Sequence, residues 1–549
     1  MNVRALLPSR RDYRQLPRTW RGDLLAGVTV GIVALPLALG FGVSSGLSAE
    51  AGLVTAVVAG LVAAVFGGSN VQVSGPTGAM VVVLVPIVAA HGAGGVAVVT
   101  ILAGAILVVA GALRLGRAVS FIPWPVIEGF TVGIAVIIFA QQIPALVSAH
   151  TAPASEHSSN AIAAAVQSFA DFDGAYFVWA LGAVAVVAAC MLGAPRLHRA
   201  IPGSLVGIVV VTVATLLLST PLARIGALPS SLPAPAVPAI DPAVLGSLIL
   251  PAATVAALAA IESLLSARVA ASLAPTGPVD ADRELVGQGL ASLASSLFGG
   301  MPATGAIART AVNVRSGGRS RLAAIVHALV LLLVVVAVAG PVGQIPLAAL
   351  AGVLMVTAVR MVDVRTVRSV LRSTRADAVA FVATAVVTVS VDLIVAVLIG
   401  VVLAGVFALR ALSRASAVRR EDIAGDPQPG DQHIAVLRFD GPLIFAAGDR
   451  ILDEIAAMED VSVVVLRLSK IDHVDATGAR LLGDIVQSLE RRGVTVLVKG
   501  MQTQHEDLFR AVGVLDALGG GDEEARVFDA LPDAIAQARR LVRGETATA

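Results

Sequence analysis

Residues 71–90 read VQVSGPTGAMVVVLVPIVAA, which is a Gly/Pro cluster followed at once by an apolar run. A second cluster occurs in the other half of the chain, where residues 299–307 read GGMPATGAI. The apolar runs that start there are too short to cross about 30 Å of hydrocarbon alone. Paired short segments interrupted by Gly or Pro are typical of a binding site in the middle of a membrane domain. These two clusters therefore predict the position of a binding site around which the membrane domain is built.

The sequence on both sides of the first cluster has the composition of a membrane domain. Residues 24–113 contain one side chain among Asp, Glu, Lys and Arg, Glu50, and only 14% of the 549 residues are charged. A soluble globular protein has roughly 25% charged residues. The apolar stretch cannot be the surface of a water-soluble domain, and the composition excludes a disordered or fibrous chain.

The residue types that carry enzyme and metal chemistry are sparse. The single cysteine, Cys190, has no partner for a disulfide, and the eight histidines show no zinc-ligand spacing. The sequence has no phosphate-binding loop or nucleotide fingerprint, and no basic stretch reads as a nucleic-acid surface. We therefore expect no enzyme activity, no cofactor, no metal ion and no nucleic-acid partner. Any transport should be driven by ion gradients.

The apolar runs divide into about fourteen helical segments, judged by the length that a membrane requires. Their cores are 24–40, 52–66, 77–90, 95–113, 125–143, 176–191 and 201–218 in the first half, and 244–265, 285–298, 304–314, 322–339, 346–359, 376–391 and 393–409 in the second. Aligning Pro76 with Pro302 gives an offset of 226 residues (302 − 76) between the halves. Because each half has an odd number of segments, the second enters the membrane from the opposite side, which predicts a seven-plus-seven inverted repeat.

Arginines predict the orientation in the membrane. Six precede the first segment and five follow the twelfth: Arg4, Arg10, Arg11, Arg14, Arg18 and Arg21, then Arg360, Arg365, Arg368, Arg372 and Arg375. Loops rich in Lys and Arg stay in the cytoplasm, so we expect a plasma (inner) membrane protein with both termini inside.

After Arg420, strand-like runs 433–439, 461–466 and 494–498 alternate with helical stretches 447–458, 477–491 and 531–542, which predicts a small cytoplasmic α/β domain.

These observations give a domain division. We predict a cytoplasmic N-terminal segment over residues 1–22 and a transmembrane domain over 23–412, with repeats at about 23–218 and 244–409. A linker over 413–430 then leads to the α/β domain over 431–549. The expected fold class is thus a polytopic α-helical membrane protein with an appended α/β domain.

The paired clusters predict an anion site. Half-helices starting at Pro76 and Pro302 would point their N-termini at one central place, and each terminus offers free N–H groups and about half a positive charge. Arg309, seven residues beyond Pro302, would add a full positive charge there. Two alternatives stay open: both clusters are ordinary kinks, or the Arg309 side chain extends to the cytoplasmic face.

An acidic residue near this site suggests coupling to an ion. Glu262 ends a mostly apolar run, and the hydroxyl of Ser266, at i+4, shares its helix face. A carboxylate beside an anion site repels the anion unless it is protonated or paired with a cation. Proton uptake by Glu262 would release Arg309 and the helix dipoles to hold an anion. A permanent Glu262–Arg309 ion pair of structural value is the alternative.

Several motifs together resemble the SulP anion permease family over most of the chain. They are Asp23-Leu24-Leu25-Ala26-Gly27, Gly75-Pro76-Thr77-Gly78, Ile122-Pro123 with Pro125-Val126 and Gly129-Phe130, Glu262-Ser263-Leu264-Leu265, Glu284-Leu285 with Gln288-Gly289, and Arg309-Thr310 with Asn313. The tail resembles a STAS domain, in which Asp475-Ala476-Thr477-Gly478 precedes a helix. The resemblance implies core and gate domains, an elevator-type movement and a homodimer.

The resemblance also implies a site and a substrate class. The substrate would lie between the third and tenth segments, at Thr77, Gly78, Ala79, Gly305, Ala306 and Arg309. The acid of the eighth segment, Glu262, with Ser266, would hold the coupling ion. Sodium-coupled bicarbonate members have a hydroxyl residue where Ile307 stands, which favours protons over sodium. In related soluble antagonists a phosphorylated serine aligns with Thr477, which is therefore either a regulatory phosphorylation site or a plain helix-capping residue.

We therefore expect a secondary active transporter of an inorganic oxyanion, sulfate first, with proton symport. The alternatives are a sodium- or proton-coupled bicarbonate or dicarboxylate transporter, an anion channel or exchanger, a nucleobase permease, and a regulatory membrane receptor. The expected partners are a small inorganic anion, a coupling proton, the lipid bilayer, a second copy of the chain, and a cytoplasmic protein that binds the STAS domain.

Overall fold

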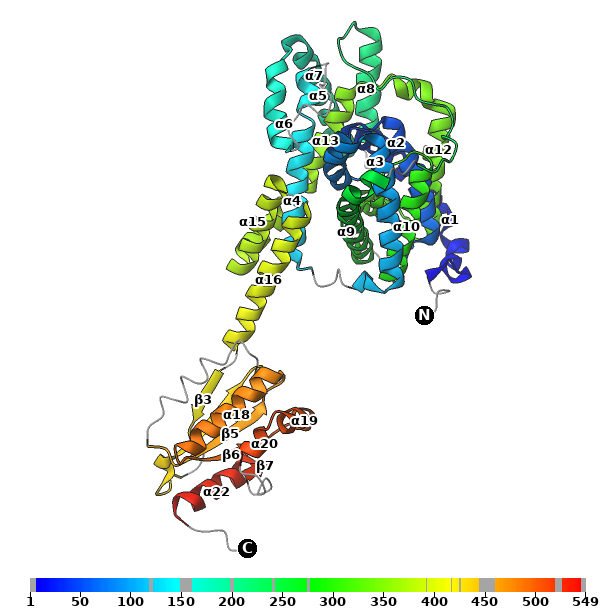
Figure 1. Ribbon diagram of the computed structural model, residues 1–549. Helices are drawn as coiled ribbons and strands as arrows, with labels where there is room; N and C mark the ends of the chain where they lie inside the picture. Colours follow the sequence, from blue (N-terminus) through cyan, green and yellow to red (C-terminus); the bar gives the residue numbers. More distant parts are fainter. Residues whose placement is uncertain are drawn as a thin grey trace. The chain divides into compact units, whose positions relative to one another are not determined.

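The computed structural model divides into two compact units, residues 1–401 and 402–549, which are described separately (Figure 1). The residues that the structure describes are 6–117, 122–148, 160–197, 202–238, 242–273, 277–391, 393–415, 417–423, 426–443, 460–518 and 526–544.

The first unit is helical, as the composition predicts. Its longer helices are α1 (Leu16–Ser44), α2 (Ala49–Phe66), α3 (Gly78–Ala112), α4 (Trp124–Gln141), α7 (Gly174–Leu197), α8 (Gly203–Leu217), α9 (Pro242–Leu273), α10 (Ala281–Leu297), α11 (Ile307–Arg315), α12 (Arg321–Gly343), α13 (Leu347–Met361) and α15 (Arg375–Ser390). Shorter ones are η2 (Arg10–Tyr13), α5 (Pro144–Val147), α6 (Ala161–Gln167), η4 (Ser168–Asp171) and α14 (Val364–Arg372). The division between the two units falls within α16 (Leu393–Ala415). Of the described helices, nine are long and apolar enough to cross a membrane.

Each predicted segment coincides with one of these helices within the described residues, and the third and fourth both lie in α3. Helix α3 runs through 35 residues, but Gly92 inside it has φ +65° and ψ −171°, which is not helical. A left-handed φ is what glycine adopts without strain. The break therefore separates two segments of α3 at the place where the sequence predicts their boundary.

Two short strands join the interrupted segments. Strand β1 (Ser74–Gly75) pairs antiparallel with β2 (Thr304–Gly305), and each strand leads into a helix, α3 or α11. The two helices thus begin side by side, which confirms the predicted meeting of the half-helices. The predicted offset of 226 residues is wrong, because the strands correspond at 230 residues (304 − 74). Pro76 follows its strand whereas Pro302 precedes its own, so the two prolines are not equivalent.

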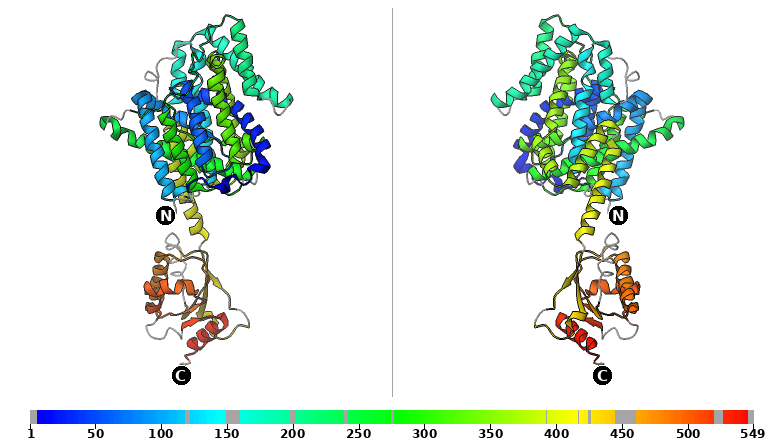
Figure 2. Two further views of the ribbon diagram at one scale, coloured as in Figure 1. Left: turned by 90° about the vertical axis from the view of Figure 1, so that its right-hand side faces the viewer. Right: turned by 90° about the vertical axis from the view of Figure 1, so that its left-hand side faces the viewer.

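The helices of this unit pack in two groups, which the views in Figures 1 and 2 help to follow. One group contains α1, α2, α3, α9, α10, α11 and α12, in which α10 packs on α3 and α2, and α1 packs on α12. The other contains α4, α7, α8, α13 and α15, in which α4 packs on α15 and α7 on α8 and α13. The first group holds segments one to four and eight to eleven, an arrangement consistent with a seven-plus-seven repeat.

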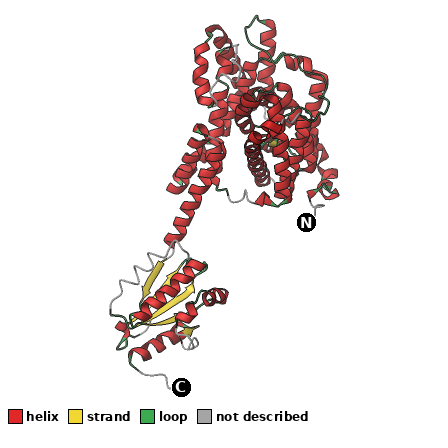
Figure 3. Cartoon of the chain, viewed as in Figure 1, coloured by secondary structure: helices red, strands yellow, loops and turns green. Residues whose placement is uncertain are grey.

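The second unit is an α/β domain, and Figure 3 shows its sheet in yellow. Its strands are β3 (Ala417–Glu421), β4 (Ile434–Asp440), β5 (Val463–Lys470), β6 (Thr495–Lys499) and β7 (Val527–Phe528), in the order β3-β4-β5-β6-β7. Strand β3 is antiparallel to β4, and the other neighbours are parallel. The α/β prediction is confirmed, although residues assigned to a linker form the end of α16 and strand β3.

Helices cover both faces of this sheet. They are α18 (Ala476–Arg491), α19 (Thr503–Ala511), α20 (Val514–Ala517) and α22 (Leu531–Val542), with η5 (Asp431–His433) before β4. Leu482 of α18 and Phe509 of α19 belong to the core on one face, and Ile535 of α22 belongs to the core on the other. The predicted helix 447–458 lies outside the described residues, whereas 477–491 and 531–542 match α18 and α22.

Candidate functional site

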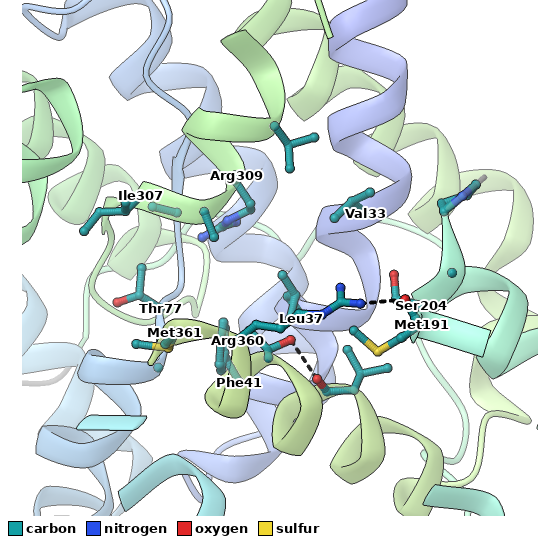
Figure 4. Close-up of a pocket in the computed structure, with 18 of the residues that line it drawn as sticks. Val33, Leu37, Phe41, Thr77, Met191, Ser204, Ile307, Arg309, Arg360 and Met361 are labelled. Atoms are coloured by element: carbon teal, nitrogen blue, oxygen red, sulfur yellow. Dashed lines mark hydrogen bonds between the residues drawn. The ribbon is translucent and has the colours of Figure 1, made fainter. Parts of the chain in front are cut away.

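A cavity of about 920 Å³ lies between the two helix groups of the first unit (Figure 4). On one wall are residues of α1, α3, α9 and α11, together with Thr77 and Ala306. On the other wall are residues of α4, α7, α8 and α13. The residues predicted for the substrate and the coupling ion that line it are Thr77, Gly78, Ala79, Glu262, Ala306 and Arg309.

The deep part of the cavity contains the starts of α3 and α11. Thr77 and Ala306 occupy the residue before each helix, and neither side chain caps its helix with a hydrogen bond. The first-turn N–H groups of a helix have no partner inside the helix and attract anions. Because β1 and β2 pair, both helix starts act on the same place.

Arg309 lies two residues into α11 and is turned back toward the start of α3. Its side chain is 2% exposed, and its Nη2 donates a hydrogen bond to the carbonyl of Pro76. Its Nη1 is buried and has no hydrogen-bond partner among the described residues. Gly75, with φ +153°, allows this approach, because a Cβ there would lie 2.8 Å from Nη1. A buried guanidinium with an unused donor is suited to an anion.

Glu262, on α9, faces the same cavity and is half-buried. Its Oε2 accepts a 2.8 Å hydrogen bond from the hydroxyl of Thr77. Within the described part of the chain, no ion pair within 4.0 Å joins Glu262 to Arg309. The structure thus differs from the alternative of a permanent ion pair, and the carboxyl group is held by a neutral donor next to the helix starts.

Two of the predicted residues, Ser266 and Gly305, lie behind the cavity wall. The Ser266 hydroxyl donates a 3.1 Å hydrogen bond to Oγ1 of Thr310, and the Gly305 N–H donates to Oγ of Ser263 at 3.0 Å. A Cβ on Gly305 would lie 1.8 Å from Nε2 of Gln72. Glycine is therefore required there for close packing of β2, and both residues support the site from behind.

A buried polar network behind β1 was assigned no role by the sequence argument. Glu284 accepts hydrogen bonds from the N–H groups of Gly68 and Ser69 and from the side-chain amides of Gln72 and Gln288, at 2.7 to 3.1 Å. Gln288 also donates to Oγ of Ser74 in β1. The signal was available in the sequence, since Glu284 and Gln288 lie one turn apart on a helix otherwise rich in small and apolar residues. This network fixes the strand that positions the cavity.

Two further residues line the cavity: Arg360, for which the sequence predicts only a role in membrane orientation, and Arg315, to which the sequence assigns no role. Both line the cavity and are exposed, in contrast to Arg309. Their position could not be predicted, because a residue at the end of a helix reaches either lipid headgroups or a cavity depending on packing between distant segments.

In the second unit, Thr477 is exposed in the first turn of α18. Asp475 caps that helix by accepting a 2.7 Å hydrogen bond from the N–H of Gly478. The capping role is thus filled by Asp475, and the Thr477 hydroxyl remains accessible. Among the residues that the structure describes, no three His, Cys, Asp or Glu side chains are grouped to hold a metal ion.

A helical membrane domain built around a cavity with a buried arginine defines a multi-pass transporter. The profile of the sulfate permease family matches residues 20–384, and that of the STAS domain matches residues 428–534. The chain belongs to the sulfate permease family, whose members are anion transporters and not enzymes.

Relatives and solved structures agree with this assignment. A protein of Bacillus subtilis named "Putative sulfate transporter YvdB" is 34% identical over 90% of this chain and 94% of its own. The "Bicarbonate transporter BicA" of a Picosynechococcus strain is 32% identical over 89% and 90%. A solved BicA transmembrane domain is 33% identical with TM-score 0.62, over 69% of this chain and 98% of its own. The structure of SLC26A9, 17% identical, shares the fold with TM-score 0.82, over 99% and 94%.

Proposed function

We propose that this protein is a secondary active transporter that moves a small oxyanion, sulfate first, together with a proton. The observation that carries the proposal is Arg309. Its guanidinium is buried, has one donor unused, and lies where two helices begin. A charge at membrane depth is costly unless it is paired, so an unpaired donor there supports a role in holding an anion.

Six residues are proposed to form the substrate site. They are Thr77, Gly78, Ala79, Gly305, Ala306 and Arg309, of which Gly305 acts through the packing of β2 and the others face the cavity. The anion would accept hydrogen bonds from the N–H groups at the helix starts and from the unused donor of Arg309. Such contacts recognise the charge of the anion and the arrangement of its oxygens, and both sulfate and bicarbonate meet these requirements.

Glu262 is proposed as the proton carrier. Its carboxyl group faces the same cavity as Arg309 without pairing to it, so a charged Glu262 would repel an arriving anion. A proton on Glu262 removes that repulsion, which couples proton uptake to anion binding. Ser266 supports this region through Thr310 instead of contacting the cavity, so we assign it a positioning role.

The movement is proposed to be of the elevator type. The cavity separates the group that carries α3, α9 and α11 from the group that carries α4, α7, α8 and α13. Displacing the first group along the second would carry the helix starts, Arg309 and Glu262 as one body. The strands β1 and β2 hold those helix starts together during the movement.

The remaining expectations are also proposals. One is the division of the chain into an N-terminal segment (1–22), a transporter domain (23–412), a linker (413–430) and a STAS domain (431–549), in which the linker would contain the end of α16 and strand β3. The arginines after α13 support cytoplasmic termini in a plasma membrane. A homodimer and a cytoplasmic protein bound by the STAS domain are inferred from the family, and the exposed hydroxyl of Thr477 supports its phosphorylation.

A transport assay tests the proposal. Purified full-length protein in liposomes is given sulfate, bicarbonate, fumarate or uracil under an imposed proton or sodium gradient. We expect sulfate accumulation that follows the proton gradient. Bicarbonate is the second candidate, because two relatives named bicarbonate transporters are 32% identical to this chain. Uptake that depends on neither gradient would show that the protein is a channel or an exchanger and not a symporter. Uptake of uracil would reject anion transport.

A further inference from the structure

We propose that Arg315 and Arg360 form a capture site for small oxyanions at the mouth of the cavity, ahead of Arg309. The inference rests on the proposed anion transport and adds a second site to it. We call the pair the mouth site. The two arginines come from opposite walls, Arg315 from α11 and Arg360 from α13.

The position of Arg315 follows from helix geometry. It lies six residues beyond Arg309 on α11, which corresponds to roughly 9 Å along the helix axis. Arg309 is 2% exposed, whereas Arg315 is exposed. An anion that enters from the end of α11 would therefore meet Arg315 before it reaches Arg309.

Arg360 belongs to the other helix group. Its Nη2 donates a 2.6 Å hydrogen bond to the carbonyl of Met191 in α7, and Figure 4 shows its side chain extended toward Met191 and Ser204. That bond fixes the side chain against the wall, but a carbonyl does not neutralise its charge. A guanidinium has five N–H donors in a planar fork, so most of them remain for an oxyanion.

The charges that line the cavity favour an anion at this position. Three arginines line it, Arg309, Arg315 and Arg360, against a single carboxylate. That carboxylate, Glu262, is bound to Thr77 next to the helix starts. The mouth therefore carries two positive charges and no lining acid. A cleft with one sign of charge and apolar walls concentrates the opposite ion and raises its association rate.

The mouth site is distinct from the basic surface of α14. Arg365, Arg368 and Arg372 belong to that helix and do not line the cavity. Lipid headgroups would be attracted by all of these arginines, whereas anion capture requires only the two that line the cavity. Arg365, whose side chain is 97% exposed, therefore serves as a matched control.

The test uses full-length protein in liposomes and three variants, Arg315→Gln, Arg360→Gln and the control Arg365→Gln. Sulfate counterflow is measured at about 10 mM and about 100 mM ionic strength, set with potassium gluconate, which shortens the Debye length from roughly 30 Å to 10 Å. We expect each mouth variant to raise KM about fivefold at low ionic strength, with kcat unchanged within about twofold. The increase should shrink at high ionic strength.

Further variants guard against loss of structure. Arg360→Lys keeps the charge and should keep KM near the wild-type value, and the double variant should raise KM more than either single one. A KM increase of the same size in Arg365→Gln would show a general surface effect and overturn the proposal. A fall in kcat with unchanged KM in the mouth variants would overturn it as well.

Failure of the proposed function would look different. In that case the wild-type protein itself would show no sulfate counterflow, irrespective of the mouth arginines. Calorimetric titration of the purified wild-type and double-variant proteins with sulfate, bicarbonate and chloride then decides the matter. Weaker binding of sulfate or bicarbonate to the double variant supports the mouth site, and equal binding of both oxyanions rejects it.

Discussion

The hydroxyl of Thr77 donates a 2.8 Å hydrogen bond to the carboxyl group of Glu262, and this bond links the start of α3 to α9 inside the cavity. Arg309, which could have paired with that carboxylate, bonds to the carbonyl of Pro76 instead. The acid proposed to carry the proton is therefore attached to one of the helix starts proposed to hold the anion. Under these two proposals, protonation of Glu262 and anion binding influence each other through this contact.

Replacing Thr77 tests that contact. We expect Thr77→Val to lower the initial rate of sulfate uptake about tenfold, because the carboxylate of Glu262, which must form again when the proton is released, loses a donor worth roughly 1–3 kcal/mol. Thr77→Ser keeps the hydroxyl and should remain within about twofold of the wild type. Equal rates for Val and Ser would mean that the hydrogen bond has no part in transport.

Replacing Glu262 separates coupling from anion movement. In Glu262→Gln the side chain keeps its shape but no longer takes up a proton. We expect sulfate counterflow to persist, whereas accumulation driven by a pH gradient should vanish. Both are measured in the same liposomes, with counterflow as the control for folding. Accumulation at the wild-type level would remove Glu262 from the coupling mechanism.

Gly75 tests the placement of the arginine. In Gly75→Ala the added methyl would lie 2.8 Å from Nη1 of Arg309 and 3.3 Å from Cα of Ala56. A displaced guanidinium should raise KM for sulfate by about tenfold, or roughly 1.4 kcal/mol. Gly94→Ala is the control, because a Cβ there would meet nothing within 4 Å. If both variants transport alike, Arg309 does not need its observed position.

A prediction for the STAS domain concerns pH. Arg539 of α22 donates two hydrogen bonds of 2.8 Å to Asp431, and these bonds hold the pKa of Asp431 below its ordinary value of 3.8. A lowered pKa in the folded state stabilises the fold above the ordinary value, and the stabilisation is lost as pH falls through the lowered pKa.

Hydrogen exchange of α22 in the full-length protein measures this effect. Asp431→Asn should increase the opening of α22 at neutral pH, after correction for the intrinsic exchange rate at each pH. The difference from the wild type should shrink as pH falls below the ordinary pKa of 3.8 and disappear once pH has passed the lowered pKa of Asp431, because the wild-type carboxylate is then protonated as well. A difference that persists at low pH would show that the ion pair is not its cause.

Much of the fold could be predicted from local sequence. The scarcity of charged residues and the Gly/Pro clusters predict the membrane segments, because the thickness of the hydrocarbon layer fixes their length. The alternation of strands and helices after Arg420 predicts the α/β domain, because the spacing of apolar residues and the turn residues are local signals. The register of the repeat was wrong by four residues, because Pro76 and Pro302 are local features on opposite sides of equivalent strands.

The site was predicted less completely. Arg309 could be named because it closely follows the second Gly/Pro cluster, and Thr77 because the resemblance to the SulP family implies a substrate site there. The bond between Thr77 and Glu262 joins residues 185 positions apart, and no local pattern reports such a pairing. For the same reason the sequence could not separate Ser266, which lies behind the wall, from residues that face the cavity.

The central claim is that the starts of α3 and α11, together with Arg309, hold the anion. The most direct measurement is the structure of the full-length protein with selenate, a heavier analogue of sulfate that anomalous scattering locates. We predict a selenate within about 4 Å of Nη1 of Arg309 and of the first N–H groups of both helices, and no such peak in Arg309→Gln. A selenate bound with full occupancy elsewhere in the wild-type cavity, with this place empty, would contradict the account.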